Sequence, residues 1–196
     1  QELCSRQIGL EVQETLDIAQ ALYETHKATT YPRSGSGYLP ESMLAEVPAV
    51  LDALLATDPS LRSLVGQLDR NQRSRAWNDG KVTAHHGIIP TLEPANLSAM
   101  DAKELAVYRL IRAHYLAQFL PHHEFDRTVA QLACGGQPLV AVGKQIAVIG
   151  WRQVLATPEP DAADGVEAQR SQVLPPLASG LRCGVEQVEL KALKTL

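Results

Sequence analysis

Apolar residues in the first 119 positions recur mainly at helical spacing. Over residues 10–27 they predict an amphipathic helix, in which Val12, Leu16, Ala19 and Tyr23 recur at helical spacing. The strongest helical pattern covers residues 97–120, where Ser98 is the expected cap and the buried stripe is Leu105, Tyr108, Ile111 and Tyr115. The N-terminal part of the chain is therefore predicted to be helical.

Prolines divide this helical part into shorter segments. Pro40 suits the first turn of a helix over residues 41–57, which Pro48 is expected to break or kink. Asp58 is expected to cap a further helix, with Pro59 at its first position.

After residue 120 the pattern changes from helix to strand. Valine-rich stretches that alternate in part predict strands at residues 125–134, 139–151 and 182–193. One shorter strand is predicted earlier in the chain, at residues 81–83. The polar residues 157–171 are expected to form an exposed loop. The prediction is an α+β fold, with a helical domain over residues 1–119 and a β-rich, incomplete segment over residues 120–196.

Charge narrows the functional classes only partly. The 196 residues carry a formal net charge of −4, whereas stand-alone nucleic-acid-binding domains are usually basic. One segment departs from this balance, because it contains three arginines and no acid: Arg70, Arg73 and Arg75. A solvated loop is the ordinary interpretation of such a segment, and contact with phosphate is the alternative.

Cysteine usage and hydropathy indicate the compartment. Three widely separated cysteines form no paired motif, which favours a reducing, cytosolic environment and argues against structural zinc. No apolar run is long enough to span a membrane. Glu2 and Arg6 interrupt any signal-peptide core near the N-terminus.

Tyr31 and Arg33 are the first candidates for chemistry. Tyr31 precedes Pro32 and is expected in extended chain, because a residue before proline avoids helical backbone angles. Side chains two residues apart in extended chain share a face, so Tyr31 and Arg33 are expected to point together. A phenol is a useful nucleophile only when activated, and a guanidinium binds phosphate with two parallel hydrogen bonds. From spacing alone, a structural role remains the commoner interpretation.

Two histidine doublets follow in the sequence. His85 and His86 lie in TAHHGIIPT, and adjacent strand residues face opposite ways, so only one of the two is expected to reach a site. A histidine there could bind phosphate or move a proton. The second doublet, His122 and His123, is interpreted as solvated.

Two longer stretches resemble type IA DNA topoisomerases, and within them the bacterial topoisomerase III group. THKATTYPRSGSGYLPESM, residues 25–43, resembles the segment that carries this family's active-site tyrosine. TAHHGIIPT, residues 83–91, resembles its second motif, Ala-His-x-(Ala/Gly)-Ile-x-Pro. The flanking residues 4–34 and 97–121 are similar as well, so the resemblance covers essentially the whole chain.

The resemblance implies roles for individual residues. Tyr31 falls on the nucleophile that attacks single-stranded DNA and leaves a 5′-phosphotyrosyl link, and Arg33 falls on the residue that holds the scissile phosphate. His85 falls on the motif histidine near that phosphate, and His86 is the variable position beside it. Religation reverses the attack without ATP, which allows relaxation and decatenation. Further contacts with DNA are expected from Arg73 and Arg75.

The resemblance also implies what lies outside this sequence. Residues 1–119 would carry the tyrosine, and residues 120–196 would form part of the arch around the central hole of a toroid. Mg²⁺ would be bound by a separate Toprim domain of the parent protein, with no metal site within this chain. The expected partners are single-stranded DNA and the rest of the parent topoisomerase, with no membrane, in the bacterial cytoplasm at the nucleoid.

One departure from the family keeps an alternative open. The family usually has aspartate two residues after the arginine, and this chain has Gly35. A carboxylate there could orient Arg33, which glycine cannot do. The alternative is a catalytically inactive DNA-binding remnant of the same family. A tyrosine recombinase fits poorly, because those enzymes place their arginine and histidine before the tyrosine.

Overall fold

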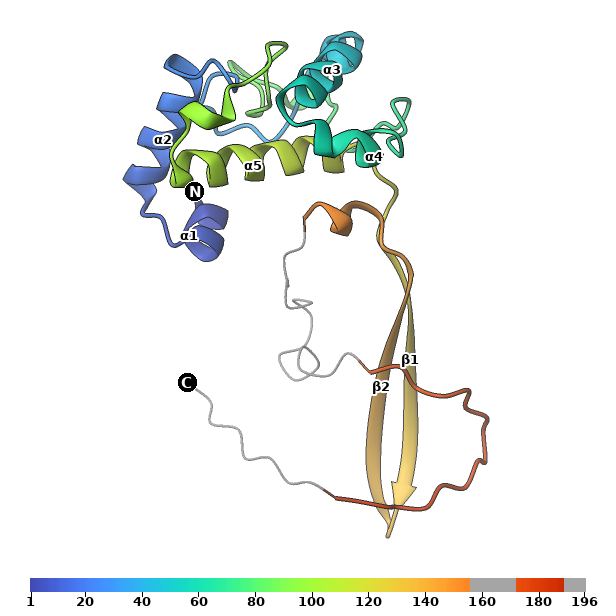
Figure 1. The fold of residues 1–196 in the computed structure, drawn as a ribbon. Helices are drawn as coiled ribbons and strands as arrows, with labels where there is room; N and C mark the ends of the chain where they lie inside the picture. Colours follow the sequence, from blue (N-terminus) through green and yellow to red (C-terminus); the bar gives the residue numbers. More distant parts are fainter. Residues whose placement is uncertain (156–171, 189–196) are drawn as a thin grey trace. The chain divides into compact units, whose positions relative to one another are not determined.

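The computed structural model describes residues 1–155 and 172–188. The chain divides into two compact units, Gln1–Glu124 with Val148–Pro158 and Phe125–Ala147 with Glu159–Leu196. Helices in the first unit and a two-stranded sheet mainly in the second confirm the predicted α+β class (Figure 1).

The first unit is built from five α-helices within the described residues. They are α1 (Glu2–Ile8), α2 (Val12–Glu24), α3 (Val47–Thr57), α4 (Arg62–Val65) and α5 (Ala102–Ala117). Short 3-10 helices connect or flank them: η1 (Glu41–Glu46), η2 (Pro59–Leu61), η3 (Asp79–Lys81), η4 (Leu97–Ala99) and η5 (Gly150–Gln153). The helix predicted over residues 10–27 is thus α2, which ends at Glu24.

Two predicted helix signals act differently in the structure. The cap of α5 is Asp101 rather than Ser98: its carboxylate accepts the amides of Lys103 and Glu104, and the Glu104 carboxylate accepts the amide of Asp101. This reciprocal capping box satisfies amides that a helix start leaves unpaired. Pro48 does not kink a helix, because it lies in the first turn of α3, where its missing N–H is not needed.

The core of the first unit lies along α5. Tyr108, Tyr115 and Leu116 of α5 are almost fully buried, in one apolar cluster with Leu22 of α2 and Leu51 of α3. Two of the predicted stripe residues, Tyr108 and Tyr115, are therefore core residues, and the other two pack against the core while half-buried. Burial of this apolar surface is the main force holding the helices together.

Strands β1 (Glu124–Cys134) and β2 (Gln137–Val148) form an antiparallel hairpin. Gly135 and Gly136 connect them with φ of 57° and 81°, which is the left-handed backbone that a two-residue hairpin turn requires. Residues 182–188, predicted as part of a strand, form no strand in the structure. The rest of that prediction and the predicted loop at 157–171 lie outside the described residues.

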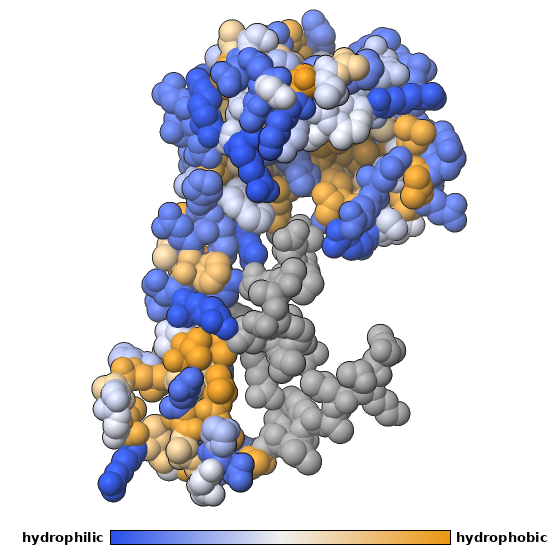
Figure 2. All heavy atoms as spheres, turned by 180° about the vertical axis from the view of Figure 1, so that it is seen from behind, coloured by the Kyte–Doolittle hydropathy of each residue, from blue (hydrophilic) through white to orange (hydrophobic). Residues whose placement is uncertain are grey.

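The hairpin exposes apolar side chains on its surface (Figure 2). Those exposed by 38% or more include Phe125, Val129, Leu132, Leu139, Val140 and Ile146.

The short strand predicted at residues 81–83 is also wrong, because the turn at Asn78 continues as η3 and ends in unpaired chain. Among the described residues, no helix is both long and apolar enough to cross a membrane.

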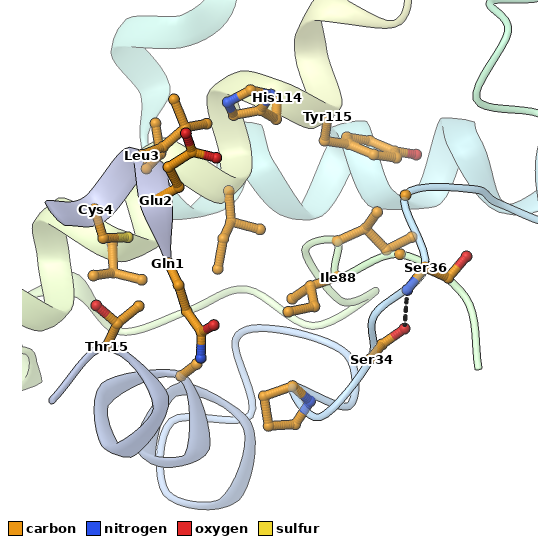
Figure 3. A pocket seen from close by; sticks show the side chains of 18 of the residues that line it. Gln1, Glu2, Leu3, Cys4, Thr15, Ser34, Ser36, Ile88, His114 and Tyr115 are labelled. Carbon is orange, nitrogen blue, oxygen red and sulfur yellow. Dashed lines mark hydrogen bonds between the residues drawn. The ribbon is translucent and has the colours of Figure 1, made fainter. Parts of the chain in front are cut away.

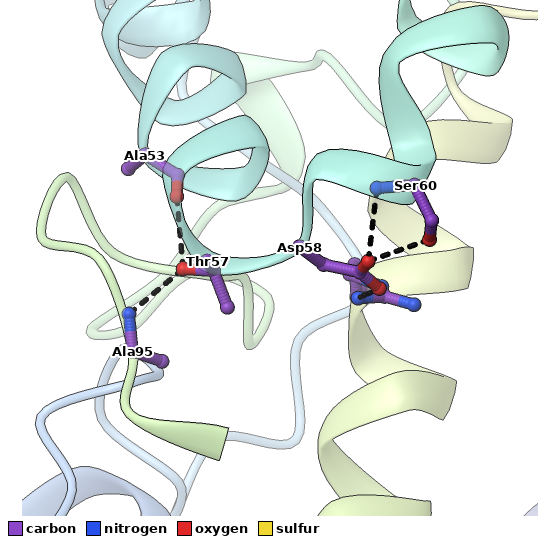
Figure 4. Close-up of polar contacts among 6 residues, drawn as sticks. Ala53, Thr57, Asp58, Ser60 and Ala95 are labelled. Carbon is purple, nitrogen blue, oxygen red and sulfur yellow. Dashed lines mark hydrogen bonds and ion pairs between the residues drawn. The ribbon is translucent and has the colours of Figure 1, made fainter. Parts of the chain in front are cut away.

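An ion pair ties the start of η2 to α5 (Figure 4). Asp58 caps η2, as predicted, by accepting the Ser60 amide at 3.2 Å, and it also accepts a hydrogen bond from Arg112 at 2.8 Å. Both side chains of the pair are at most 20% exposed. The hydrogen bond from the Ser60 hydroxyl, and then Arg112, lower the pKa of the Asp58 carboxyl.

Replacing Asp58 with alanine should lower the free energy of unfolding by about 2 kcal/mol, because a cap and a shielded ion pair are both lost. Since folding lowers the carboxyl's pKa, this contribution is complete above the unfolded value of about 3.9 and is lost as pH falls through the folded value. Urea unfolding at neutral and acidic pH measures it. The control is Asp52→Ala, on the exposed face of α3; equal losses in both variants would contradict the assignment.

Candidate active site

Backbone hydrogen bonds pair the chain just before Tyr31 with the end of the TAHHGIIPT motif. The Thr30 amide donates to the Ile89 carbonyl at 2.9 Å, and the Thr91 amide donates to the Ala28 carbonyl at 3.2 Å. The Ile89 amide also donates to the Thr30 hydroxyl at 3.0 Å. The pairing is antiparallel. Two motifs almost 60 residues apart in sequence thus form one structural unit.

This pairing places Tyr31 between two aromatic rings. Its ring meets Tyr23 of α2 edge-on, with centroids 5.7 Å apart, and lies 4.8 Å from the His85 ring at a tilt of 42°. Tyr31 is nevertheless 38% exposed. A ring held on two sides but open to solvent can present its hydroxyl to a ligand, which a purely packing tyrosine does not do.

The two histidines of the motif are used differently. His85 is exposed and lies against Tyr31. His86 is half-buried, and its Nδ1 lies 2.7 Å from the Gly87 carbonyl oxygen, so this contact requires the Nδ1–H tautomer or the imidazolium. Of the two, the structure brings His85 to the tyrosine.

Arg33 lies at a different part of the site. It lines a cleft of about 850 Å³, together with Ser34 and residues of α1, α2 and α5 (Figure 3). Burial lowers the pKa of His114 and raises that of Tyr115, both of which project from α5 beside this cleft. Within residues 1–155 no ring or cation–π contact joins Tyr31 and Arg33, and their predicted shared face stays a prediction.

The arginine-rich loop is attached to the chain that follows Tyr31. The Leu39 amide donates to the Ala76 carbonyl at 2.7 Å, so Arg75 is the residue directly before this junction. Arg70, Arg73 and Arg75 are all exposed. The Arg73 guanidinium is held locally by the Arg70 carbonyl at 3.2 Å. Arg70 and Arg75 place their charged side chains at the surface of the first unit.

A second tie closes the loop from Pro32 to Tyr38. The Gly87 amide donates to the Tyr38 carbonyl at 2.7 Å. The chain forms a loop between the hydrogen bond of the Thr30 amide and that of the Tyr38 carbonyl, and Gly35 lies in the middle of this loop. A Cβ placed on Gly35 meets nothing within 4 Å, so the first side-chain atom at this position has open space.

Three residues near the site were not identified from the sequence. The sequence places Tyr23 only in the helical pattern of residues 10–27, although its ring contacts Tyr31. The Lys27 ammonium lies 5.9 Å from the Tyr23 ring centre, and Lys81 donates to the Tyr38 hydroxyl at 3.2 Å. Helical spacing cannot show which ring a stripe residue meets across the fold, and no sequence signal marks the two lysines.

The described residues contain no group of three His, Cys, Asp or Glu side chains that could hold a metal ion. These residues therefore offer no ready-made protein cage for a metal ion.

Comparison with known proteins links both motifs to one family. The DNA topoisomerase family profile matches residues 1–196. The chain is 35% identical over 191 residues to DNA topoisomerase 3 of Vibrio cholerae, covering 97% of this chain and 29% of that protein. It is 37% identical over 193 residues to that of Pasteurella multocida, covering 97% and 28%, and 39% identical over 176 residues to that of Salmonella typhimurium, covering 90% and 26%. The chain therefore spans less than a third of these relatives.

Thr30→Val should loosen the pairing while keeping the side-chain shape. The Ile89 amide then loses its acceptor, which costs about 1–3 kcal/mol for a buried donor. The expected results are faster hydrogen exchange at the Ile89 amide and a weaker nuclear Overhauser effect between Tyr31 and His85. The matched control is Thr91→Val. The Thr91 hydroxyl donates to the Lys27 carbonyl at 2.7 Å, and in the variant this exposed carbonyl can accept a hydrogen bond from water instead. Unchanged exchange at Ile89 in Thr30→Val would refute the role of the pairing.

Proposed function

The chain belongs to the DNA topoisomerase family, and we propose that within its parent protein it carries the nucleophilic tyrosine of a type IA enzyme. The proposed activity is transient cleavage of single-stranded DNA, passage of another strand, and religation without ATP. The observation that carries this proposal is that the Tyr31 ring packs against His85 while the residue remains partly exposed to solvent.

The proposed step exchanges one phosphate ester for another. The Tyr31 hydroxyl oxygen bonds to the phosphorus, the bond from phosphorus to the 3′ oxygen breaks, and the tyrosine stays on the 5′ phosphate. The phenol loses its proton and the leaving 3′ oxygen gains one. Because the phosphodiester bond energy is kept in the phosphotyrosyl link, the reverse attack restores the strand without ATP.

Charged side chains around Tyr31 would supply the phosphate contacts. Arg33 would hold the scissile phosphate as its oxygens gain charge, and fixed cationic donors are the usual means of stabilising such a transition state. His85 would bind the same phosphate or move the proton, since histidine titrates near neutral pH. His86, Arg73 and Arg75 would contact the strand on either side.

The remaining parts of the proposal concern the parent protein. The helical residues 1–119 would form the tyrosine-bearing domain, and the hairpin with the residues that follow it, 120–196 in all, would contribute to the arch. Mg²⁺ would be bound by the Toprim domain of the complete enzyme. The parent would act on the chromosome in the bacterial cytoplasm. The competing proposal is a DNA-binding remnant without catalysis, which Gly35 favours.

In the complete parent protein, Tyr31→Phe should abolish the covalent adduct with a labelled oligonucleotide, because phenylalanine has no oxygen to attack phosphorus. Arg33→Ala should slow adduct formation on the order of 10²–10³-fold, the usual cost of losing one charge-stabilising donor. Denaturing gels measure both. Arg109→Ala, on the exposed side of α5, is the control for loss of one charge. An adduct that persists in Tyr31→Phe would refute the proposal, and no adduct in the unaltered protein would support the inactive remnant.

The 196-residue chain alone should not relax supercoiled plasmid. It spans at most 29% of the compared relatives, and strand passage requires a protein that can open and hold both ends of the cut strand. Agarose electrophoresis after incubation with magnesium measures relaxation, with the complete parent protein as positive control. Relaxation that disappears in the Tyr31→Phe chain would show that this part suffices by itself.

A further inference from the structure

A second, smaller pocket lies beside the tyrosine loop within the first unit. Its volume is about 270 Å³, and its walls come from the loop Ser34–Tyr38 and from the segment between Lys81 and His85. Arg33 does not line it, and Lys81 does not line the larger cleft. The two hollows therefore present different cations on two sides of the same loop.

The smaller pocket carries positive charge without an opposing acid. Lys81 is exposed, and its ammonium uses one of three N–H donors on the Tyr38 hydroxyl at 3.2 Å while lying 4.9 Å from that ring's centre. None of the residues that line the pocket is acidic. The acid nearest to Lys81 in sequence, Asp79, accepts the Glu41 amide at 2.8 Å.

The loop that faces Lys81 is ordered by its own hydroxyl groups. The Ser36 amide donates to the Ser34 hydroxyl at 3.1 Å, and the Tyr38 amide donates to the Ser36 hydroxyl at 3.1 Å. In the described part of the chain, the amides of Gly35 and Gly37 have no such partner. A fixed loop with spare amide donors next to an ammonium favours a compact anion.

We propose that this pocket binds a phosphate of single-stranded DNA that flanks the phosphate attacked by Tyr31. This rests on the proposed function for the choice of DNA as the source of the phosphate. His85 connects the two positions, because it lies against Tyr31 and also lines the pocket. Lys81 is the binding cation of this second position.

Gly35 gives the proposal a charge-specific test. It lines the pocket, and a Cβ there meets nothing within 4 Å, so the first side-chain atom of aspartate or asparagine has open space. Aspartate at this position adds a carboxylate beside Lys81, which competes with phosphate for the ammonium. Asparagine has nearly the same shape and no charge. The glycine thus keeps Lys81 available to an anion, and the two variants separate charge from shape.

The experiment measures binding of an oligothymidylate to the 196-residue chain at several salt concentrations. Lys81→Gln should weaken binding about fivefold at low salt, typical of one exposed charge pair. It should also lower the slope of log affinity against log salt by about 0.7, the value for one phosphate contact on a single strand. Gly35→Asp should behave similarly and should weaken binding more than the uncharged Gly35→Asn, whereas the exposed-charge control Arg109→Gln should match the unaltered chain.

Equal effects of Lys81→Gln and Arg109→Gln would overturn the proposal, as would equal effects of Gly35→Asp and Gly35→Asn. If the unaltered chain does not bind the oligonucleotide, the proposed contact of this chain with DNA fails, and inorganic phosphate decides the site separately. Phosphate should then shift the amide resonances of Gly35 and Gly37, and Lys81→Gln should remove those shifts. Amides that do not respond to phosphate would overturn the pocket as an anion site.

Discussion

The antiparallel pairing of residues 28–30 with residues 89–91 is the constraint on which the site depends. It consists of backbone hydrogen bonds, reinforced by the Thr30 hydroxyl that accepts the Ile89 amide. A second bond, from the Gly87 amide to the Tyr38 carbonyl, closes the other end. The chain between these ties must leave the paired segment and return to it, so Tyr31 and the loop that follows are held at the surface beside His85.

This arrangement separates support from chemistry. The supporting residues are buried: α2 packs against α5 in the apolar core. Tyr23 of α2 in turn contacts the Tyr31 ring. The side chains proposed to act on DNA are exposed: Arg33 lies on one side of the loop, Lys81 and His85 lie on the other, and the Arg75 loop joins at Leu39. Net charge is a poor guide to such a site, because a chain of charge −4 can still gather cations around one tyrosine.

The sequence predicted those features that depend on local chemistry. Helix α5, the cap at Asp58 and the hairpin strands follow from spacing and turn residues. The cap of α5 was assigned to Ser98 because Asp101 follows it by three residues, yet Asp101 with Glu104 makes the complete box. Residues 182–188 show the limit of the method: a valine-rich, partly alternating pattern favours a strand, but a strand also needs a partner. The Tyr23–Tyr31 contact depends on tertiary packing, which no local pattern encodes.

The most direct test of the account is to locate the DNA on the protein. The complete parent protein is trapped with a single-stranded oligonucleotide and digested with trypsin, and the peptide that carries the nucleotide is identified by mass spectrometry. The account predicts the nucleotide on Tyr31, in the peptide from Ala28 to Arg33 between Lys27 and Ser34. A nucleotide on Tyr38 or on any other tyrosine would contradict it.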